Sequence, residues 1–168
     1  MAKRSFAHVN WTPGATADGS TLAAGFMALK GGSGTQLIDI LEFMTEGMAG
    51  ASSPSPLVLA YNSTIGATPT GLATPDADGP MNPATAALAA PPVSYVAATT
   101  NPTRSNATTS PKLTFGINAF GGIVRWNAAP TQQISILGNT ASLGEISVSC
   151  YTGGTPGLMQ SHIIYEPY

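Results

Sequence analysis

Short segments of alternating apolar and polar residues, separated by turns rich in glycine and proline, fill the last third of the chain and constrain its fold most strongly. Five of them are expected to be strands: 112–119, 122–128, 133–137, 142–151 and 161–166. Within 142–151, Ile146 and Val148 alternate with Glu145 and Ser147, the pattern of a strand with one wet face. Such spacing predicts a mainly β fold, a β-sandwich or a jelly-roll-like arrangement.

One segment, residues 36–48, instead has the periodicity of a short amphipathic helix. Its apolar face would hold Leu37, Ile40, Leu41, Met44 and Met48, and its acidic face Asp39, Glu42 and Glu46. Thr35 is placed to cap its start. We therefore expect one short helix over this segment, which would close the open side of the sheet core, and a solvated row of acids on its far face.

The middle of the chain is poor in both charge and regular structure. Ten of the fourteen prolines fall between Pro54 and Pro111, which limits strands there to short pieces such as 57–61 and 93–97. A stretch of Ala, Thr, Pro and Gly buries too little apolar area to offset the entropy lost on ordering. The sequence predicts an extended Pro/Ala/Thr-rich segment over 62–92 that straps onto a partner.

The length suits a single β-rich domain over 1–168 that begins with an N-terminal arm, residues 1–12. A further strand is expected within 20–30. Basic and aromatic residues interleave in the arm, and aromatic residues recur at the carboxyl end. These residues are the candidates for contact with a partner: Lys3, Arg4, Phe6, His8, Trp11, Tyr165 and Tyr168.

Only 14 of the 168 residues are charged, whereas a typical domain of this length carries roughly 42 charges. Surfaces with so few charges repel their neighbours weakly, which favours permanent packing against other chains. The net charge of −2 and the scattered cations argue against nucleic-acid binding. No apolar run approaches the roughly 20 residues of a membrane span, and polar residues interrupt any secretory leader behind Arg4.

No residue pattern in the chain predicts catalysis, a cofactor or a metal. His8 and His162 have no acid or cysteine at ligand spacing, so each is expected to form structural hydrogen bonds. Cys150 is the only cysteine and is expected to be a half-buried thiol in a strand. We therefore predict a protein that is not an enzyme and that needs no cofactor.

The last third of the sequence also carries a family resemblance. It reads Gly144 to Ser149, then Gly153 to Gly157, then Ser161 to Pro167. This pattern resembles small virion proteins of tailed bacteriophages, and together with the low charge it is similar to capsid decoration (cement) proteins. The resemblance implies a β-rich homo-oligomer, with a trimer favoured, that binds the major capsid protein on the virion surface. It also implies synthesis in the host cytoplasm without a signal peptide.

The leading prediction is a non-enzymatic virion structural protein that binds the outside of a phage capsid and stabilises it across subunit junctions. One alternative is a carbohydrate-binding β-sandwich module of a fibre or tail, with Trp126 beside Arg125, or Trp11, at the sugar. The other alternative is a self-assembling coat or tube protein.

Overall fold

The computed structural model is mainly β, built of antiparallel sheets. It describes residues 6–12, 27–71, 79–82, 84, 88–100, 102, 111–139, 143–150 and 159–168. None of these described residues is in a helix. The expectation of a mainly β chain is confirmed for this part of the molecule.

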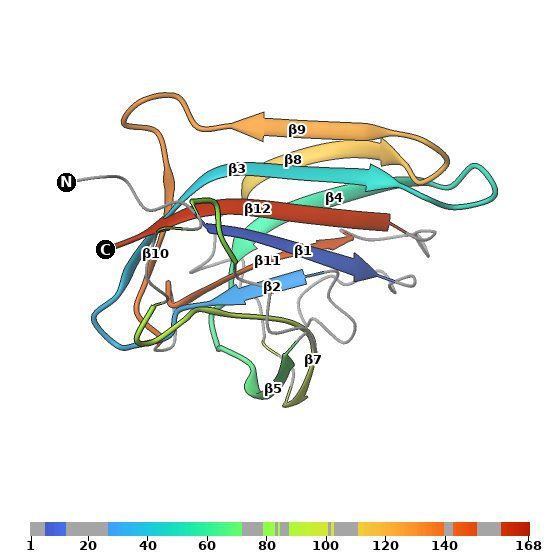
Figure 1. Ribbon diagram of the computed structural model, residues 1–168. Helices are drawn as coiled ribbons and strands as arrows, with labels where there is room; N and C mark the ends of the chain where they lie inside the picture. The colour runs from blue at the N-terminus through green and yellow to red at the C-terminus, as the bar shows by residue number, and fades with distance from the viewer. Residues whose placement is uncertain are drawn as a thin grey trace.

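The strands form two sheets, here called the β3 sheet and the β11 sheet (Figure 1). The β3 sheet contains β1 (Phe6–Thr12), β3 (Leu37–Gly47), β6 (Gly79–Pro80), β9 (Ile123–Asn127), β10 (Ile134–Leu137) and β12 (Met159–Pro167). The β11 sheet contains β2 (Met27–Lys30), β4 (Pro54–Tyr61), β5 (Ala67–Gly71), β7 (Val93–Thr100), β8 (Pro111–Asn118) and β11 (Glu145–Cys150).

The strands pair in a nested order. The first strand, β1, pairs with the last, β12, and β2 pairs with β11. Further in, β3 pairs with both β9 and β10, and β4 pairs with β8. All these pairs are antiparallel. Between β4 and β8, the chain adds β5 and β7 to the β11 sheet and β6 to the β3 sheet.

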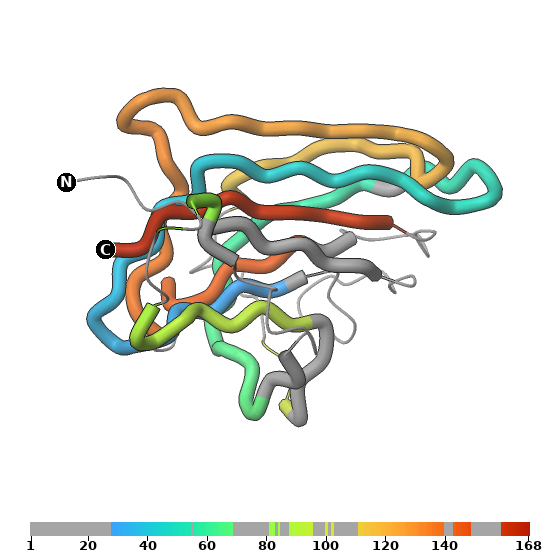
Figure 2. Tube along the Cα trace, in the orientation of Figure 1, coloured from blue at the N-terminus to red at the C-terminus, as the bar shows by residue number. Residues whose placement is uncertain are grey.

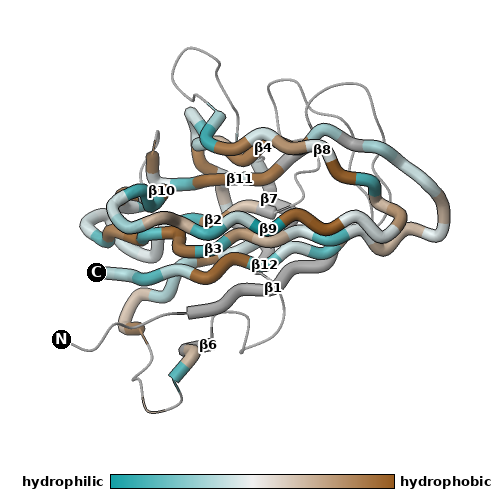
Figure 3. Tube along the Cα trace, turned by 90° about the horizontal axis from the view of Figure 1, so that it is seen from above, coloured by the Kyte–Doolittle hydropathy of each residue, from teal (hydrophilic) through white to brown (hydrophobic). Residues whose placement is uncertain are grey.

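One apolar core lies between the sheets, because every second residue of each strand points to the same side. Both sheets contribute to it: Leu29, Leu57, Leu59, Ile117, Ile146 and Val148 from the β11 sheet, and Ile38, Ile40, Phe43, Ile134, Ile136, Met159, Ile163 and Tyr165 from the β3 sheet. Apolar stretches are visible in β4, β11 and β12 (Figure 3).

The predicted helix over 36–48 is wrong, because residues 37–47 form β3, the longest strand of the described chain. This strand is central to its sheet. β12 pairs along one edge, and β9 and β10 pair along the other, as Figure 2 shows for β12 beside β3. A helix would leave the edges of those three strands unpaired, whereas the strand satisfies them and still buries Ile38, Ile40 and Phe43.

A β-bulge explains why this strand has a helical pattern. Opposite β12, Ile164 pairs with Glu42 and Tyr165 with Ile40, so Leu41 is the extra residue. The bulge reverses the alternation: Ile40 before it and Phe43 after it both point into the core. Asp39 and Glu42, three residues apart, therefore share the outer face, as they would on a helix.

The other expected strands are found. The predicted segments 57–61 and 93–97 lie within β4 and β7, and the strand expected in 20–30 includes β2. The five segments of the last third correspond to β8, β9, β10, β11 and β12. Among the described residues of the predicted extended segment 62–92, β5 and β6 pair with β7 and β1 of the same chain.

Candidate interaction surface

The predicted N-terminal arm is, from residue 6 onward, a strand of the β3 sheet. Phe6 pairs with Tyr165, His8 with Ile163 and Trp11 with Gln160 in the register of β1 with β12. Residues 6–12 of the predicted arm thus pair with a strand of the same chain. Lys3 and Arg4, two of the predicted partner contacts, lie outside the described residues.

The two aromatic candidates at the carboxyl end have opposite surroundings. Tyr165 is fully buried in the core, so it offers no surface to a partner, which corrects its selection as an interface residue. Tyr168 is 66% exposed and remains a candidate. Its amide donates to the Leu37 carbonyl at 2.8 Å, and its hydroxyl donates to Glu166 at 3.2 Å. The last residue is thus held beside the start of β3.

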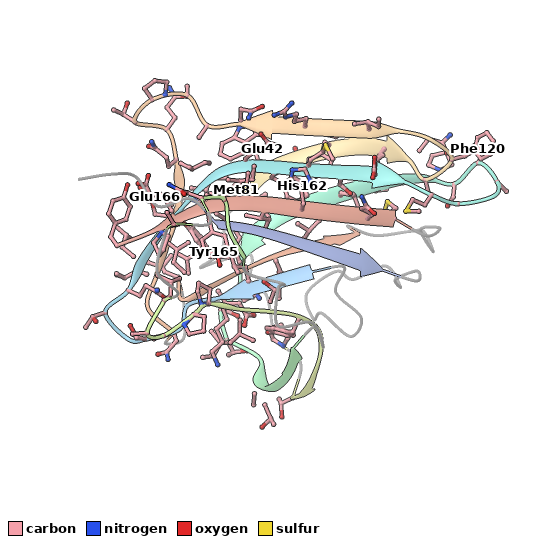
Figure 4. All side chains as sticks on the ribbon, viewed as in Figure 1. Glu42, Met81, Phe120, His162, Tyr165 and Glu166 are labelled. Atoms are coloured by element: carbon pink, nitrogen blue, oxygen red, sulfur yellow. The ribbon has the colours of Figure 1, made fainter. Side chains whose placement is uncertain are left out.

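A polar cluster around Glu42 lies on the outer face of the β3 sheet (Figure 4). Arg125 and Asn127 each donate to Glu42 Oε2 at 2.7 Å, and His162 Nε2 lies 3.0 Å from Oε1. Hydrogen bonding to Arg125 is the main cause that lowers the pKa of the Glu42 carboxyl to about 2. Burial opposes the shift, and His162 and Asn127 add to it. The expectation that His162 forms a structural hydrogen bond is confirmed.

Two further acids of β3 lie along this face. Ser135 Oγ donates to Asp39 at 2.5 Å, and Gln160 Nε2 donates to Glu46 at 2.5 Å. The acids expected on one face of a helix therefore do share a face, but on a strand. Each makes a contact with a neighbouring strand, and none lies in a described cluster that could hold a metal ion.

The outer face of the β11 sheet holds a second carboxylate, Glu145, which is completely buried. Its Oε2 accepts hydrogen bonds from the Tyr95 hydroxyl at 2.5 Å and from the Gly66 amide at 3.2 Å. Asn62 Nδ2 donates to Oε1, and Ser147 Oγ donates at 2.7 Å to the Asn62 side-chain oxygen. Residues 62–66 therefore lie over this carboxylate.

Burial raises the pKa of the Glu145 carboxyl, although these three donors and the charge of Lys30 act in the opposite direction. Lys30 itself donates to the Gly66 carbonyl at 3.4 Å. Burial also raises the pKa of Tyr95, and Glu145 adds to that shift. The predicted wet face of β11 is thus wrong at Glu145 and Ser147, because the chain's own middle segment covers it.

Apolar side chains are exposed mainly at the two ends of β3. At its start, Leu37 pairs with Leu137 of β10. The Leu137 amide donates to the Leu143 carbonyl, and the Tyr168 amide donates to the Leu37 carbonyl. We call these four exposed residues the Tyr168 patch. At the far end, Gly47 and Ala49 are bonded to Gly122 and Ala119.

These bonds hold the segments that carry three exposed residues, which we call the Phe120 patch: Met48, Phe120 and Ile123. Figure 4 shows Phe120 at the end of the molecule opposite Glu166, the residue that contacts Tyr168. Sequence reasoning missed both patches except for Tyr168. Their residues are far apart in sequence, so only the strand pairing could reveal them.

Two shallow hollows lie side by side on β4 and β8 and share Pro56 and Gly116 in their lining. No acid, base or cysteine lines either hollow. Trp126, the predicted sugar platform, is partly buried and packs against the core.

Comparison with known proteins finds no matching family model and no matching characterised protein. Within the described ranges, no helix has the length and apolarity that a membrane crossing requires.

Proposed function

We propose that this chain is a non-enzymatic structural protein of a virion, which binds the outside of a phage capsid and stabilises it across subunit junctions. The observation that carries the proposal is the nested strand pairing, first with last and second with second last. A long hairpin wound into two facing sheets is the arrangement of a jelly roll, which is common in viral capsid and lectin domains. The pairing supports a β-sandwich of this type.

The surface chemistry supports the same proposal. With 14 charged residues, the chain depends on uncharged polar and apolar groups at its surface. Seven of its large exposed apolar side chains form the two end patches. Exposed apolar patches can serve as contact sites for other chains, including further copies of this one. The proposed capsid partner is the major capsid protein, and the resemblance to decoration proteins favours a homo-oligomer, a trimer first.

The place of action follows from the same resemblance. We propose that the protein is made in the host cytoplasm and ends on the capsid surface. Neither nucleic acid nor a membrane is a proposed partner, because the described cations are dispersed: Arg125 is paired with Glu42, and Lys30 donates to the Gly66 carbonyl. Lys112 lies 5.2 Å from the centre of the Tyr61 ring, on another strand pair.

The test is reconstitution on empty phage heads that lack this protein. Purified chain should co-sediment with the heads in a saturable ratio and raise the temperature at which they break. Heads from an unrelated phage serve as the control. Failure to bind, or binding without any change in the disruption temperature, would contradict the proposal.

The carbohydrate-binding alternative shares the fold type, because lectins also use jelly rolls. It predicts glycan binding that disappears in Trp126→Ala or Trp11→Ala. The packing of Trp126 against the core weighs against it, since a sugar platform needs an open indole face.

The self-assembling coat or tube alternative is favoured by one observation, the presence of an apolar patch at each end of β3. It predicts that the purified chain alone forms closed shells or long tubes, visible by electron microscopy. The decoration proposal predicts only small oligomers in the absence of heads.

A further inference from the structure

We infer that the two end patches bind each other between copies of this chain: the Tyr168 patch of one copy docks on the Phe120 patch of the next. This inference rests on the proposed structural role and names a second copy as a partner. It is tested in solution without any capsid, so its failure leaves the head-binding test unaffected.

The position of the patches is the first argument. They lie at opposite ends of β3, which has 11 residues and so spans roughly 33 Å. Leu37 and Leu137 on one side, and Ile123 on the other, are on outward-facing positions of the same sheet. An interface between two different patches of one chain repeats from copy to copy, and closes into a ring when the rotation allows it.

The exposed area is the second argument. Exposed fractions run from 36% for Leu37 to 66% for Tyr168 in one patch, and from 40% for Met48 to 66% for Ile123 in the other. A large apolar side chain offers on the order of 200 Å². The patches then expose roughly 400 and 300 Å², about 700 Å² per junction. If that is about 60% of the contact, the total reaches roughly 1,200 Å², the lower limit of a standard interface.

The charges beside the patches distinguish docking of the Tyr168 patch on the Phe120 patch from docking of two identical patches. Both described charges beside the Tyr168 patch are acids, Asp39 next to Leu37 and Glu166 against Tyr168. Two copies that joined through this patch would bring those acids together. The Phe120 patch is flanked by charges of both signs: Arg125, which is bonded to Glu42 and 60% exposed, and Glu46, which lies opposite Ile123. Docking of the two different patches therefore places the acids beside a region of mixed charge, whereas two Tyr168 patches would place acids against acids.

Backbone strain at Leu143 is the fourth argument. This residue has φ of +92° while its side chain is exposed. A bulky residue in this region is a costly outlier, and such strain is found where a site requires a particular side chain. Glycine or asparagine would relieve the strain. A second copy docked on this patch would cover the exposed Leu143 side chain.

The experiment uses two matched variants, each of which disables one patch. Leu137→Lys alters the Tyr168 patch. Ile123→Lys alters the Phe120 patch and places the new lysine opposite Glu46. The control is Met81→Lys, an equally exposed residue, 57%, outside both patches. Sedimentation velocity is measured from about one to several hundred micromolar, since a junction of this size is expected to be of micromolar strength.

Wild type and Met81→Lys should associate with rising concentration, whereas each patch variant alone should remain monomeric. An equal mixture of the two patch variants should form a 1:1 dimer and grow no further, because together they hold one intact patch of each kind. The inference is overturned if wild type is monomeric throughout, if either patch variant still dimerises alone, or if Met81→Lys abolishes association.

Leu143→Asn provides an independent check. Asparagine tolerates a positive φ, so thermal stability should not fall, while association should weaken at least about tenfold. Unchanged association would contradict the assigned role of Leu143, and with it the extent of the Tyr168 patch.

Discussion

Glu42 on the β3 sheet and Glu145 on the β11 sheet each have three hydrogen-bond partners, yet their pKa values move in opposite directions. Glu42 contacts the cation Arg125 on a face open to solvent. Glu145 is completely buried, and all its direct donors are neutral. The number of hydrogen bonds therefore does not set the direction. At Glu42 the hydrogen bond from Arg125 is the largest cause and outweighs burial, with His162 and Asn127 adding to it. At Glu145 burial is the largest cause and outweighs the neutral donors and the charge of Lys30.

The outer faces of the two sheets also differ in how far they are open to solvent around these carboxylates. The β3 face presents polar and apolar groups to solvent, with patches at both ends. The β11 face is closed at Glu145 by residues 62–66 of the same chain. The proline-rich middle segment, expected to bind a foreign surface, therefore binds in part to its own sheet. Four changes test this contrast, from the largest expected effect to the smallest.

Removal of the buried carboxylate should have the largest effect. Glu145→Ala leaves Asn62, Tyr95 and the Gly66 amide without their acceptor inside the protein, at an expected cost of about 3 to 5 kcal/mol. Urea denaturation measures the loss. Glu145→Gln keeps one oxygen as acceptor and should lose less. Equal losses in the two variants would show that Glu145 contributes to stability through packing alone.

Glu145→Gln also tests the sign of the pKa shift. A carboxyl whose folded pKa is raised above its unfolded value favours the folded state at low pH, and this contribution is lost as the pH rises through the folded pKa. Wild type should therefore lose this stability as the pH rises above 4.5, the ordinary pKa of this group, whereas Glu145→Gln should show no such decrease.

The close approach of Gly66 to Tyr95, beside Glu145, should have the next largest effect on stability. A Cβ added at Gly66 would lie 2.2 Å from the Tyr95 hydroxyl oxygen, so Gly66→Ala must displace either Tyr95 or the covering segment. The expected cost is about 2 kcal/mol. Gly116→Ala is the matched control, because its Cβ would meet no atom within 4 Å. If both variants unfold at the same denaturant concentration, the close approach is not maintained in solution.

At the open face, Glu42→Gln should have a smaller effect that depends on pH. The lowered pKa of Glu42 contributes stability that is complete above pH 4.5 and is lost as the pH falls toward 2. Since water surrounds Arg125, we expect about 1 to 2 kcal/mol at neutral pH. Thermal unfolding at several pH values measures it. Wild type and variant should converge near pH 2, and a difference that persists there would contradict an ionic cause.

The smallest expected effect comes from two serines, each of which donates a hydrogen bond to an acceptor on the outer face of a sheet. Ser147→Ala leaves the Asn62 side-chain oxygen buried without this donor, which should cost about 1 kcal/mol. Ser135→Ala removes a bond to the part-exposed Asp39, where water can replace it, and should change stability by under about 0.5 kcal/mol. Equal costs would mean that the two faces are equally accessible to water.

Much of the fold could be predicted from local pattern. The alternation in residues 112–166 indicated all five strands of that region, since an antiparallel strand with one buried face has a period of two. The period failed at β3, where the extra residue Leu41 shifts the alternation and imitates a helix. It also failed at β11, where a polar residue does not reveal whether water or another segment lies above it.

For the candidate surface, the sequence indicated Tyr168 and the structural role of His162, but it placed Tyr165 at an interface although that residue is in the core. The end patches combine residues from β3, β9, β10 and the connecting loops. Single exposed apolar residues are ordinary in any sequence, and only their proximity makes a patch.

The sequence by itself determined the class of this protein: a chain of short alternating segments, with few charges and many turns, that can bury its apolar residues only between β-sheets. Tertiary structure decided which strands pair, which outer face is closed and which apolar residues meet at the ends. These outcomes depend on contacts between residues up to 159 positions apart, such as Phe6 with Tyr165. Local periodicity carries no information on such contacts, because it reports only how each segment divides its own residues between two sides.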